Sequence, residues 1–166
     1  MTDTDPLRDA YRALLDAAAT VADSGDARRT PPPGEWDGDQ ILAHVSLVSA
    51  LTVTAVSHVT SGASATYDNR MAQDSWTLRR VIERAGGNAG LRNRIRLQAD
   101  ALRALSGADP SCGPVLSEDE LDTLVPTLLL SNGAVQVDRP VPLRDLVAGL
   151  AAQELPGHTA QLLALR

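Results

Sequence analysis

Apolar residues recur along most of the chain every three to four positions, the spacing of the buried face of an amphipathic helix. Clusters of glycine and proline interrupt this pattern and predict helix ends and loops. Between residues 127 and 138 the pattern changes to short apolar runs, which indicates strands. The predicted helices run from the N-cap Asp5 and Pro6 to Gly25, from the N-cap Asp37 to Thr60, from Tyr67 to Ser106 with a break at Gly86-Gly87-Asn88, and from Pro142-Leu143 to the C-terminus.

Local signals define the start of the second helix most clearly. Asp37 and Gln40 have the spacing of a capping box, in which each side chain binds the backbone N–H of the other residue. Trp36 and Ile41 stand where a hydrophobic staple would form. Two segments that are rich in proline, glycine or small polar residues are predicted loops, at residues 24–34 and 107–118.

One hairpin is predicted before the last helix. The runs Thr127–Ser131 and Ala134–Asp138 flank Asn132-Gly133, a pair that favours a tight turn because both residues accept a positive φ. The sequence has no internal repeat, and 166 residues suffice for one domain with a core. We therefore expect a single all-α domain over residues 1–166, a four-helix bundle with a small β-hairpin before the last helix.

Composition and charge narrow the classes of protein. Hydrophobic residues make up 43% of the chain and charged residues 22%, and without any Phe the core must consist of Leu, Val, Ala and Ile. The formal net charge of −6 disfavours nucleic-acid binding. We find no apolar run long enough to span a membrane, no signal peptide at the acidic N-terminus, and a single Cys that cannot form an internal disulfide. These features predict a cytoplasmic protein.

Three polar side chains fall on helix faces that are otherwise apolar: His44 in the second helix, and Glu154 and His158 in the last. Burying a carboxylate or an imidazole is costly unless a partner binds it. Glu154 and His158 are four residues apart and therefore share a helix face. Two His and one carboxylate from two helices match an open divalent-metal site. The alternatives are a Glu–His hydrogen-bonded pair without metal and, for His44 alone, a core His with a satisfied hydrogen bond.

The last helix contains a proline between two of these residues. Pro156 removes one backbone hydrogen bond and crowds the carbonyl of Ala152, so a kink is predicted there, and Gly157 adds flexibility. Such a kink would either disturb the spacing of Glu154 and His158 or aim the two side chains.

Other candidate groups have a weaker basis. His58 is 14 residues from His44, which is about 21 Å along a helix, so the two cannot share a metal. Cys112 has no basic neighbour in the sequence that would activate a thiol. The glycines of residues 86–90 lack the Lys-Ser/Thr ending of a phosphate-binding loop. Three arginines spaced two residues apart are expected to splay around a helix as a solvated surface; these are Arg92, Arg94 and Arg96.

Four short motifs follow one another along nearly the whole chain. They are Trp36-x7-His44, the Asn132-Gly133 hairpin, Val141-Pro142-Leu143-Arg144-Asp145-Leu146-Val147, and Glu154-x3-His158-x2-Gln161. In their order and spacing, these motifs resemble the DinB/YfiT-like superfamily. Within that superfamily the sequence is most similar to the N-terminal domain of the mycothiol-dependent maleylpyruvate isomerases.

The resemblance implies a four-helix bundle with one divalent metal ion, held by His44, Glu154 and His158. It implies zinc, with nickel or manganese as alternatives, and mycothiol or another small thiol. The metal would deprotonate the thiol, and the thiolate would attack an electrophilic carbon of a small-molecule substrate. The isomerases carry a further C-terminal domain, whereas this sequence ends at Arg166, so their own substrate is not carried over.

Three functions follow as hypotheses. The first is a metal-dependent transferase or isomerase that uses a small thiol and acts on small electrophiles. The second is a non-catalytic metal-binding or ligand-binding protein, with a role in stress. The third is an interaction domain in which the three polar residues are structural packing. None of them requires nucleic acid or a membrane as a partner, and the apolar helix faces are compatible with a homodimer.

Overall fold

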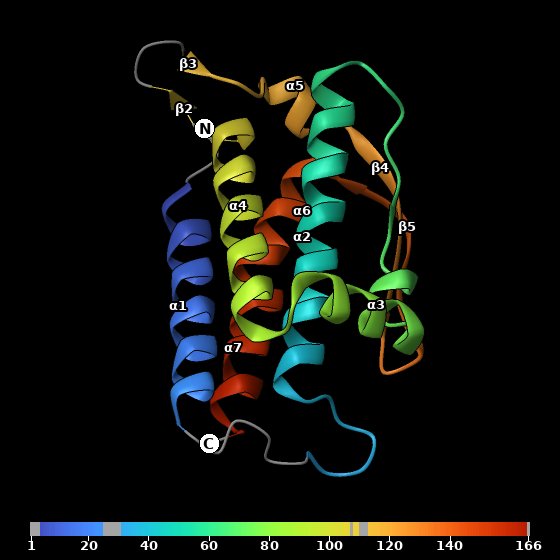
Figure 1. Cartoon of the computed structure of the whole chain (residues 1–166). Helices are drawn as coiled ribbons and strands as arrows, with labels where there is room; N and C mark the ends of the chain where they lie inside the picture. The colour runs from blue at the N-terminus through green and yellow to red at the C-terminus, as the bar shows by residue number, and fades with distance from the viewer. Residues whose placement is uncertain (1–3, 25–30, 107, 110–112, 166) are drawn as a thin grey trace.

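The structure, a computed structural model, describes residues 4–24, 31–106, 108–109 and 113–165 and is mainly helical with a small three-stranded sheet (Figure 1). The helices are α1 (Thr4–Asp23), α2 (Gly38–Thr60), α3 (Ser75–Ala85), α4 (Asn88–Ser106), α5 (Glu118–Leu121), α6 (Leu143–Gly149) and α7 (Leu155–Leu163), with a 3-10 turn η1 (Arg70–Ala72) and a π-helical turn η2 (Leu150–Glu154). The strands are β1 (Tyr67–Asp68), β2 (Ala108–Asp109), β3 (Gly113–Pro114), β4 (Leu124–Ser131) and β5 (Ala134–Pro142).

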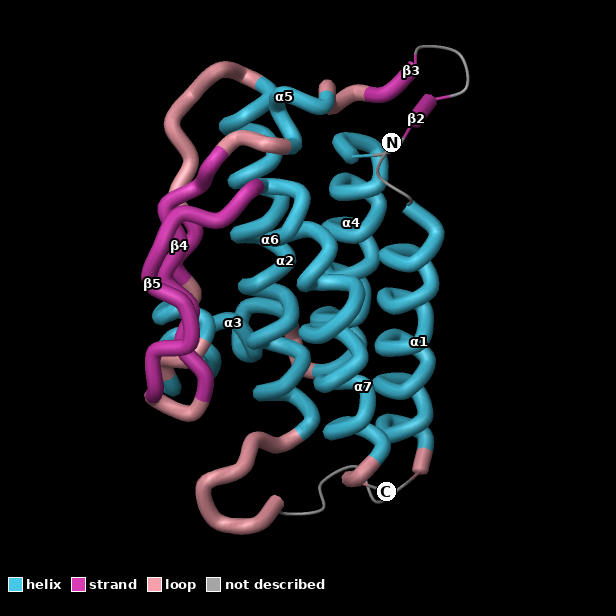
Figure 2. Tube along the Cα trace, turned by 180° about the vertical axis from the view of Figure 1, so that it is seen from behind, coloured by secondary structure: helices cyan, strands magenta, loops and turns pink. Residues whose placement is uncertain are grey.

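The long helices run side by side and enclose the core. α2 packs against α4, and α1 packs against both α4 and α7. The sheet of β1, β4 and β5 lies on the far side of α2 from α1 (Figures 1 and 2). The core is mostly aliphatic, as the composition predicts, with fully buried leucines from each of the long helices; they include Leu14, Leu42, Leu91, Leu102, Leu155 and Leu162.

The predicted start of the second helix is confirmed. The Asp37 side chain accepts the N–H of Gln40 (2.8 Å), and the Gln40 side chain accepts the N–H of Asp37 (2.9 Å). The helix ends at Thr60, where the sequence placed it. The predicted start of the first helix is wrong, because α1 (Thr4–Asp23) already includes Thr4 and Asp5, so Asp5 is not its N-cap residue. The predicted stop signal Gly25 lies outside the described residues.

The predicted helix from Tyr67 is wrong over its first eight residues. Tyr67 and Asp68 form β1, which pairs in parallel with β4, and α3 begins only at Ser75. Asp74 caps α3, since its side chain accepts the N–H of Thr77 (2.8 Å). The predicted break is confirmed at Gly86 and Gly87, whereas Asn88 already belongs to α4: Gly86 ends α3 in the left-handed conformation (φ 79°), and α4 runs to Ser106 as predicted.

The predicted hairpin is confirmed and is longer than expected. β4 and β5 pair across a two-residue turn in which Asn132 (φ 51°) and Gly133 (φ 75°) both adopt a positive φ. This is the conformation that the Asn-Gly pair favours. Because β1 joins β4 at the other edge, the element is a three-stranded sheet of order β1-β4-β5.

The predicted loop at 107–118 has more structure than expected. β2 and β3 form a short antiparallel pair, and α5 follows with a capping box between Ser117 and Glu120. Arg144 at the start of α6 bonds to Glu118 and Asp122, which ties α5 to the last helix. Cys112 lies outside the described residues.

The last helix begins at Leu143 as predicted, and its interruption takes a specific form. The backbone widens into the π-helical turn η2, in which the N–H of Leu155 bonds to the carbonyl of Leu150, five residues back. Pro156 follows at once, at the start of α7. A proline cannot donate to the turn before it and crowds the fourth carbonyl back, and the wider turn relieves both constraints.

The sequence was expected to hold no apolar run long enough to span a membrane, and α2 corrects this expectation. By length and composition it could cross a membrane, with a mean hydropathy of 1.5 in its most apolar window. However, 61% of that window is buried inside the protein, as in the core helices of soluble proteins. Its polar residues Ser49 and Thr52 are buried and hydrogen-bonded to Tyr11 and Tyr67. One such helix therefore says little about a membrane.

Candidate metal centre

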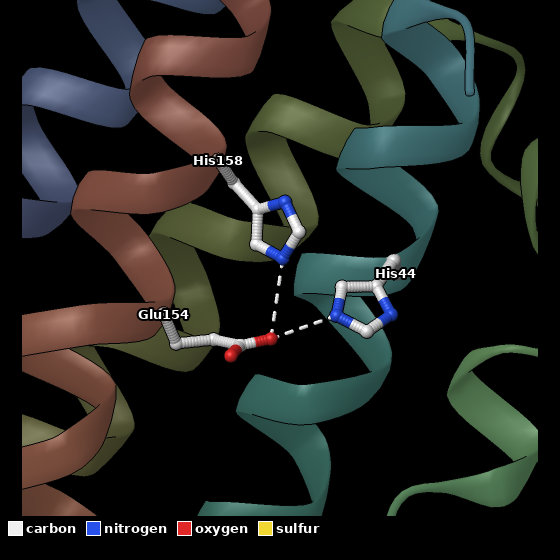
Figure 3. Close-up of side chains that lie close together, drawn as sticks. All are labelled: His44, Glu154 and His158. Carbon is white, nitrogen blue, oxygen red and sulfur yellow. Dashed lines mark hydrogen bonds and ion pairs between the residues drawn. The ribbon is translucent and has the colours of Figure 1, made fainter. Parts of the chain in front are cut away.

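His44, Glu154 and His158 meet between α2 and the last helix (Figure 3). Nε2 of His44 lies 2.8 Å from Oε1 of Glu154, and Nε2 of His158 lies 3.2 Å from the same oxygen. One ligand atom from each residue lies within 4.8 Å of the other two, so the group could hold a metal ion. The structure thus brings together the three residues that the sequence singled out, and the π-helical turn ends at one of them, Glu154.

His44 is fixed by a backbone carbonyl on its other side. The side chain is only 3% exposed, and its Nδ1–H donates to the carbonyl of Ala72 in η1 (2.7 Å). A neutral imidazole carries one N–H, so in the neutral ring this bond leaves Nε2 without a hydrogen and with a free lone pair. Nε2 faces Oε1 of Glu154: in the protonated ring Nε2–H donates to that oxygen, and in the neutral ring the Nε2 lone pair can bind a metal ion.

His158 is held in the same way by a side chain of its own helix. Its Nδ1–H donates to Oε1 of Gln161 (2.7 Å), which leaves Nε2 to face Glu154. Its side chain is 13% exposed, so it stands nearer the surface than His44. Metal-binding histidines almost always donate their second ring N–H to a carbonyl, a carboxylate or water. Both histidines of this group have such a partner.

Glu154 supplies the charge of the group. Burial raises the pKa of its carboxyl, but hydrogen bonds and charges from His158 and His44 outweigh burial and hold that pKa well below its ordinary value. The side chain remains 36% exposed, more than either histidine. The carboxylate is therefore ionised at neutral pH and is reached by solvent.

The three atoms satisfy one another when the histidines are protonated, and they offer three metal ligands when the histidines are neutral. A neutral histidine that donates through Nδ1 cannot also donate through Nε2, so two neutral rings would turn lone pairs toward the carboxylate. A tetrahedral zinc ion with bonds of about 2.0–2.1 Å places its ligand atoms about 3.3 Å apart. The two separations from Oε1 of Glu154 are 2.8 and 3.2 Å, and all three ligand atoms lie within 4.8 Å of one another, so the side chains would have to adjust to admit an ion.

Trp36 forms an aromatic wall beside the two histidines. Its ring centroid lies 4.8 Å from that of His44 and 6.3 Å from that of His158. The capping box of Asp37 places Trp36 just before the first turn of α2. The sequence predicted a hydrophobic staple for Trp36, and the structure places its ring beside the candidate ligands.

The sheet positions the carbonyl that binds His44. Asn69 accepts the N–H of Leu130 in β4 (2.8 Å) and donates to its carbonyl (3.0 Å), and Gln73 donates to that carbonyl as well. The carbonyl of Asn69 in turn accepts the N–H of Ala72 (3.0 Å). The hairpin thus holds η1, and η1 presents a carbonyl to Nδ1 of His44. Sequence reasoning missed Asn69 and Ala72, because neither belongs to a recognisable motif.

We expect Asn69→Ala to loosen the centre from a distance. The change leaves the N–H of Leu130 without its partner and frees η1 to move, so metal affinity should fall about 10- to 100-fold, as for other partners of metal-binding histidines. Competition with a chromogenic zinc chelator measures this. The control is Gln136→Ala, an exposed position of β5 whose one bond is local. Equal affinities in Asn69→Ala and wild type would show that the sheet does not position His44.

Tyr67 is a further buried polar group near the centre. Burial raises the pKa of Tyr67 to about 12, with the charge of Glu154 adding to the effect and the Thr52 hydrogen bond opposing it. Burial also raises the pKa of Tyr11, the only other tyrosine of the chain. Both phenols stay neutral at ordinary pH, so Tyr67 is not a base for the centre.

A spectroscopic titration tests this state of the tyrosines. In the folded protein neither phenol should ionise near pH 10, whereas both should do so in urea. Because the folded pKa values are raised, stability is complete below about pH 10 and falls above it, by about 1.4 kcal/mol per pH unit for each tyrosine. The measurements are tyrosinate absorbance and urea unfolding, made at steps of about one pH unit between about pH 9 and 12. A native transition near pH 10 would show that a phenol is accessible.

His58 is exposed in the last turn of α2 and is not a member of the group of His44, Glu154 and His158, as expected.

A scan against protein-family models found no match, and searches of the curated proteins and of the solved structures found none either, so the comparisons assign no family.

Proposed function

We propose that the chain is a DinB/YfiT-like four-helix bundle that binds one divalent metal ion through His44, Glu154 and His158. The single observation that carries the proposal is the direction of the two histidines. Each donates Nδ1–H to a fixed acceptor, the carbonyl of Ala72 or the amide of Gln161, and each turns Nε2 toward the same carboxylate oxygen. The mutual packing of α1, α2, α4 and the last helix supports the bundle.

Zinc is the ion that we propose, with nickel and manganese as alternatives. Two imidazoles and one carboxylate form a donor set that zinc accepts, and three protein ligands leave a position for a small molecule. The exposure of Glu154 supports access to that position from solvent. The sulfur-containing ligand is proposed from the resemblance in the sequence alone.

The activity that we propose is transfer of a small thiol, such as mycothiol, to a small electrophile, or isomerisation of that electrophile. The ion, when bound, lowers the pKa of a coordinated thiol so that it reacts as the thiolate. His44 and His158 contribute neutral nitrogens, and Glu154 contributes one negative charge that offsets part of the charge of the ion. Trp36 covers one side of the histidine pair and limits the approach from that side.

A second function is favoured by the surroundings of the site. Tyr67 is neutral because its pKa is raised, and within the part of the chain that the structure describes the cluster of His and carboxylate groups consists of the three candidate ligands. A site without a separate base suits binding of metal and ligand without turnover. We therefore keep a non-catalytic metal-binding protein as the alternative.

The test is thiol binding and turnover by protein loaded with zinc, nickel or manganese. Calorimetry with mycothiol, glutathione and cysteine measures binding, and 1-chloro-2,4-dinitrobenzene serves as the electrophile. We expect binding and turnover that are lost in His158→Ala and kept in His58→Ala, a matched change at an exposed histidine. Binding without turnover of any electrophile supports the alternative. If the metal-loaded protein binds none of the thiols, the thiol-dependent activity is refuted.

A further inference from the structure

An open cavity of about 360 Å³ lies between α1 and α4, lined by residues of these two helices alone. The α1 residues that line it recur at helical spacing from Arg8 to Ala19, and the α4 residues recur from Arg92 to Arg103. Each set is therefore one continuous face of its helix. Figures 1 and 2 both show α1 and α4 side by side along their length. The volume is within the range of small-molecule sites.

The rim of this cavity is basic although the protein is acidic. The formal net charge of the chain is −6, yet five of the arginines line the cavity and only two carboxylates do. The carboxylates are Asp16 and Asp100. The arginines are Arg8, Arg12, Arg92, Arg96 and Arg103. An isolated concentration of positive charge on an acidic protein attracts anions to that place.

Two of these arginines are not neutralised by carboxylates. Arg8 and Arg12 pair with Asp9 (3.2 and 3.3 Å), and Arg103 pairs with Asp100 (3.7 Å). Arg92 and Arg96 have no ion pair among the residues that the structure describes; the polar contact of Arg96 is with the amide oxygen of Asn93. They are four residues apart, so they face the cavity together.

Arg92 carries a buried donor without a partner. Its Nε is buried and makes no hydrogen bond within the described part of the chain. A buried N–H is stabilised when an acceptor reaches it, and a guanidinium offers Nε and Nη together to the two oxygens of a carboxylate or phosphate. The three arginines splay around α4 and Arg96 is exposed, as expected, whereas the buried Nε of Arg92 departs from the expected solvated surface. Of Arg92, Arg94 and Arg96, Arg94 lies on the other side of α4, toward α2.

The floor of the cavity is apolar or neutral. Tyr11 is 2% exposed and bonded to Ser49 (2.8 Å), and burial raises its pKa, so it contributes a neutral ring. Leu15, Ala19 and Ala99 add aliphatic surface. A ligand that uses both rim and floor therefore needs an anionic group and an apolar body.

We propose that the cavity between α1 and α4 binds a small organic anion, a phosphate or carboxylate carried on an apolar body, through Arg92 and Arg96. This site is separate from the candidate metal centre, whose three residues lie on α2 and the last helix. It is therefore independent of the proposed function.

The experiment is calorimetric titration of the full chain with phenyl phosphate and with benzoate. Inorganic phosphate probes the anionic group alone, and benzyl alcohol probes the apolar body alone. Arg92→Gln and Arg96→Gln remove one charge each while keeping most of the side chain, and Arg94→Gln is the matched control on the other side of α4. Circular dichroism establishes that each variant is folded, and His158→Ala separates the result from the metal centre.

We expect one site for at least one of the two organic anions. Its affinity should fall about tenfold in Arg92→Gln and in Arg96→Gln, the effect of losing a charged hydrogen bond. Arg94→Gln and His158→Ala should bind as the wild type does, and benzyl alcohol should not bind. The proposal is overturned if neither organic anion binds at millimolar concentration, if Arg94→Gln weakens binding as much as Arg92→Gln, or if His158→Ala abolishes it. The proposal would also be overturned, in favour of an acidic protein partner, if the protein bound poly-glutamate but neither phenyl phosphate nor benzoate.

Discussion

Purified wild-type protein is expected to contain one divalent metal ion per chain, and His44→Ala is expected to contain almost none. The two remaining ligands, Glu154 and His158, are four residues apart on one helix and cannot surround an ion without a group from α2. The ion should also stabilise the fold, because it binds the native chain and finds no such site in the unfolded one. At a free metal concentration about 1,000 times the dissociation constant, the gain is about 4 kcal/mol.

Elemental mass spectrometry of protein without an affinity tag measures the metal, and thermal unfolding with and without zinc measures the stabilisation. His58→Ala is the control, because it removes an exposed imidazole from the same helix. It should keep both the metal and the zinc-dependent rise in Tm. If wild-type protein stays free of metal after exposure to zinc, nickel and manganese, the three residues form a Glu–His pair and a core His.

Leu155→Ala is expected to destabilise the protein by about 2–5 kcal/mol, the usual cost of removing a fully buried leucine side chain from a core. Leu155 is 0% exposed and is the first residue of α7, directly after the π-helical turn. Its N–H makes the bond to Leu150 that closes this turn. Its buried side chain therefore anchors the start of α7, directly after the candidate ligand Glu154.

Urea unfolding measures this cost, and Leu163→Ala in the same helix is the control. Leu163 is 39% exposed, so the same truncation there should cost far less. The unfolding slope with urea should be similar in both variants, because neither changes which surface unfolding exposes. Similar losses at the two positions would show that α7 is not anchored through Leu155.

The sequence predicted the parts of the fold that rest on local chemistry. The capping box of Asp37 and Gln40 and the Asn132-Gly133 turn depend on neighbours within a few residues, and both are present. The candidate centre was also predictable, because His44, Glu154 and His158 are polar residues on otherwise apolar helix faces. These polar residues stand where the helical pattern predicts apolar ones, and this alone singles them out without any knowledge of how α2 and the last helix pack.

Other parts could not be predicted because they depend on distant residues. β1 has two residues, too few to show alternation, and it is a strand only because β4 pairs with it some sixty positions later, Tyr67 with Thr127. Pro156 predicted an interruption, but whether the helix kinks or widens depends on the packing of both halves. The α5 helix is different: the Ser117 and Glu120 capping box was a readable local signal for it.

The backbone carbonyl that binds His44 has a consequence for how the site can evolve. A carbonyl is present whatever residue occupies position 72, so substitutions there keep the acceptor as long as the new side chain fits a position that is 0% exposed. Selection at this position acts on size and chain path, and not on a functional group. Gln161 is the opposite case, because its role for His158 belongs to its side chain and can be lost by a single substitution. We therefore expect natural drift to alter the His158 half of the centre before the His44 half.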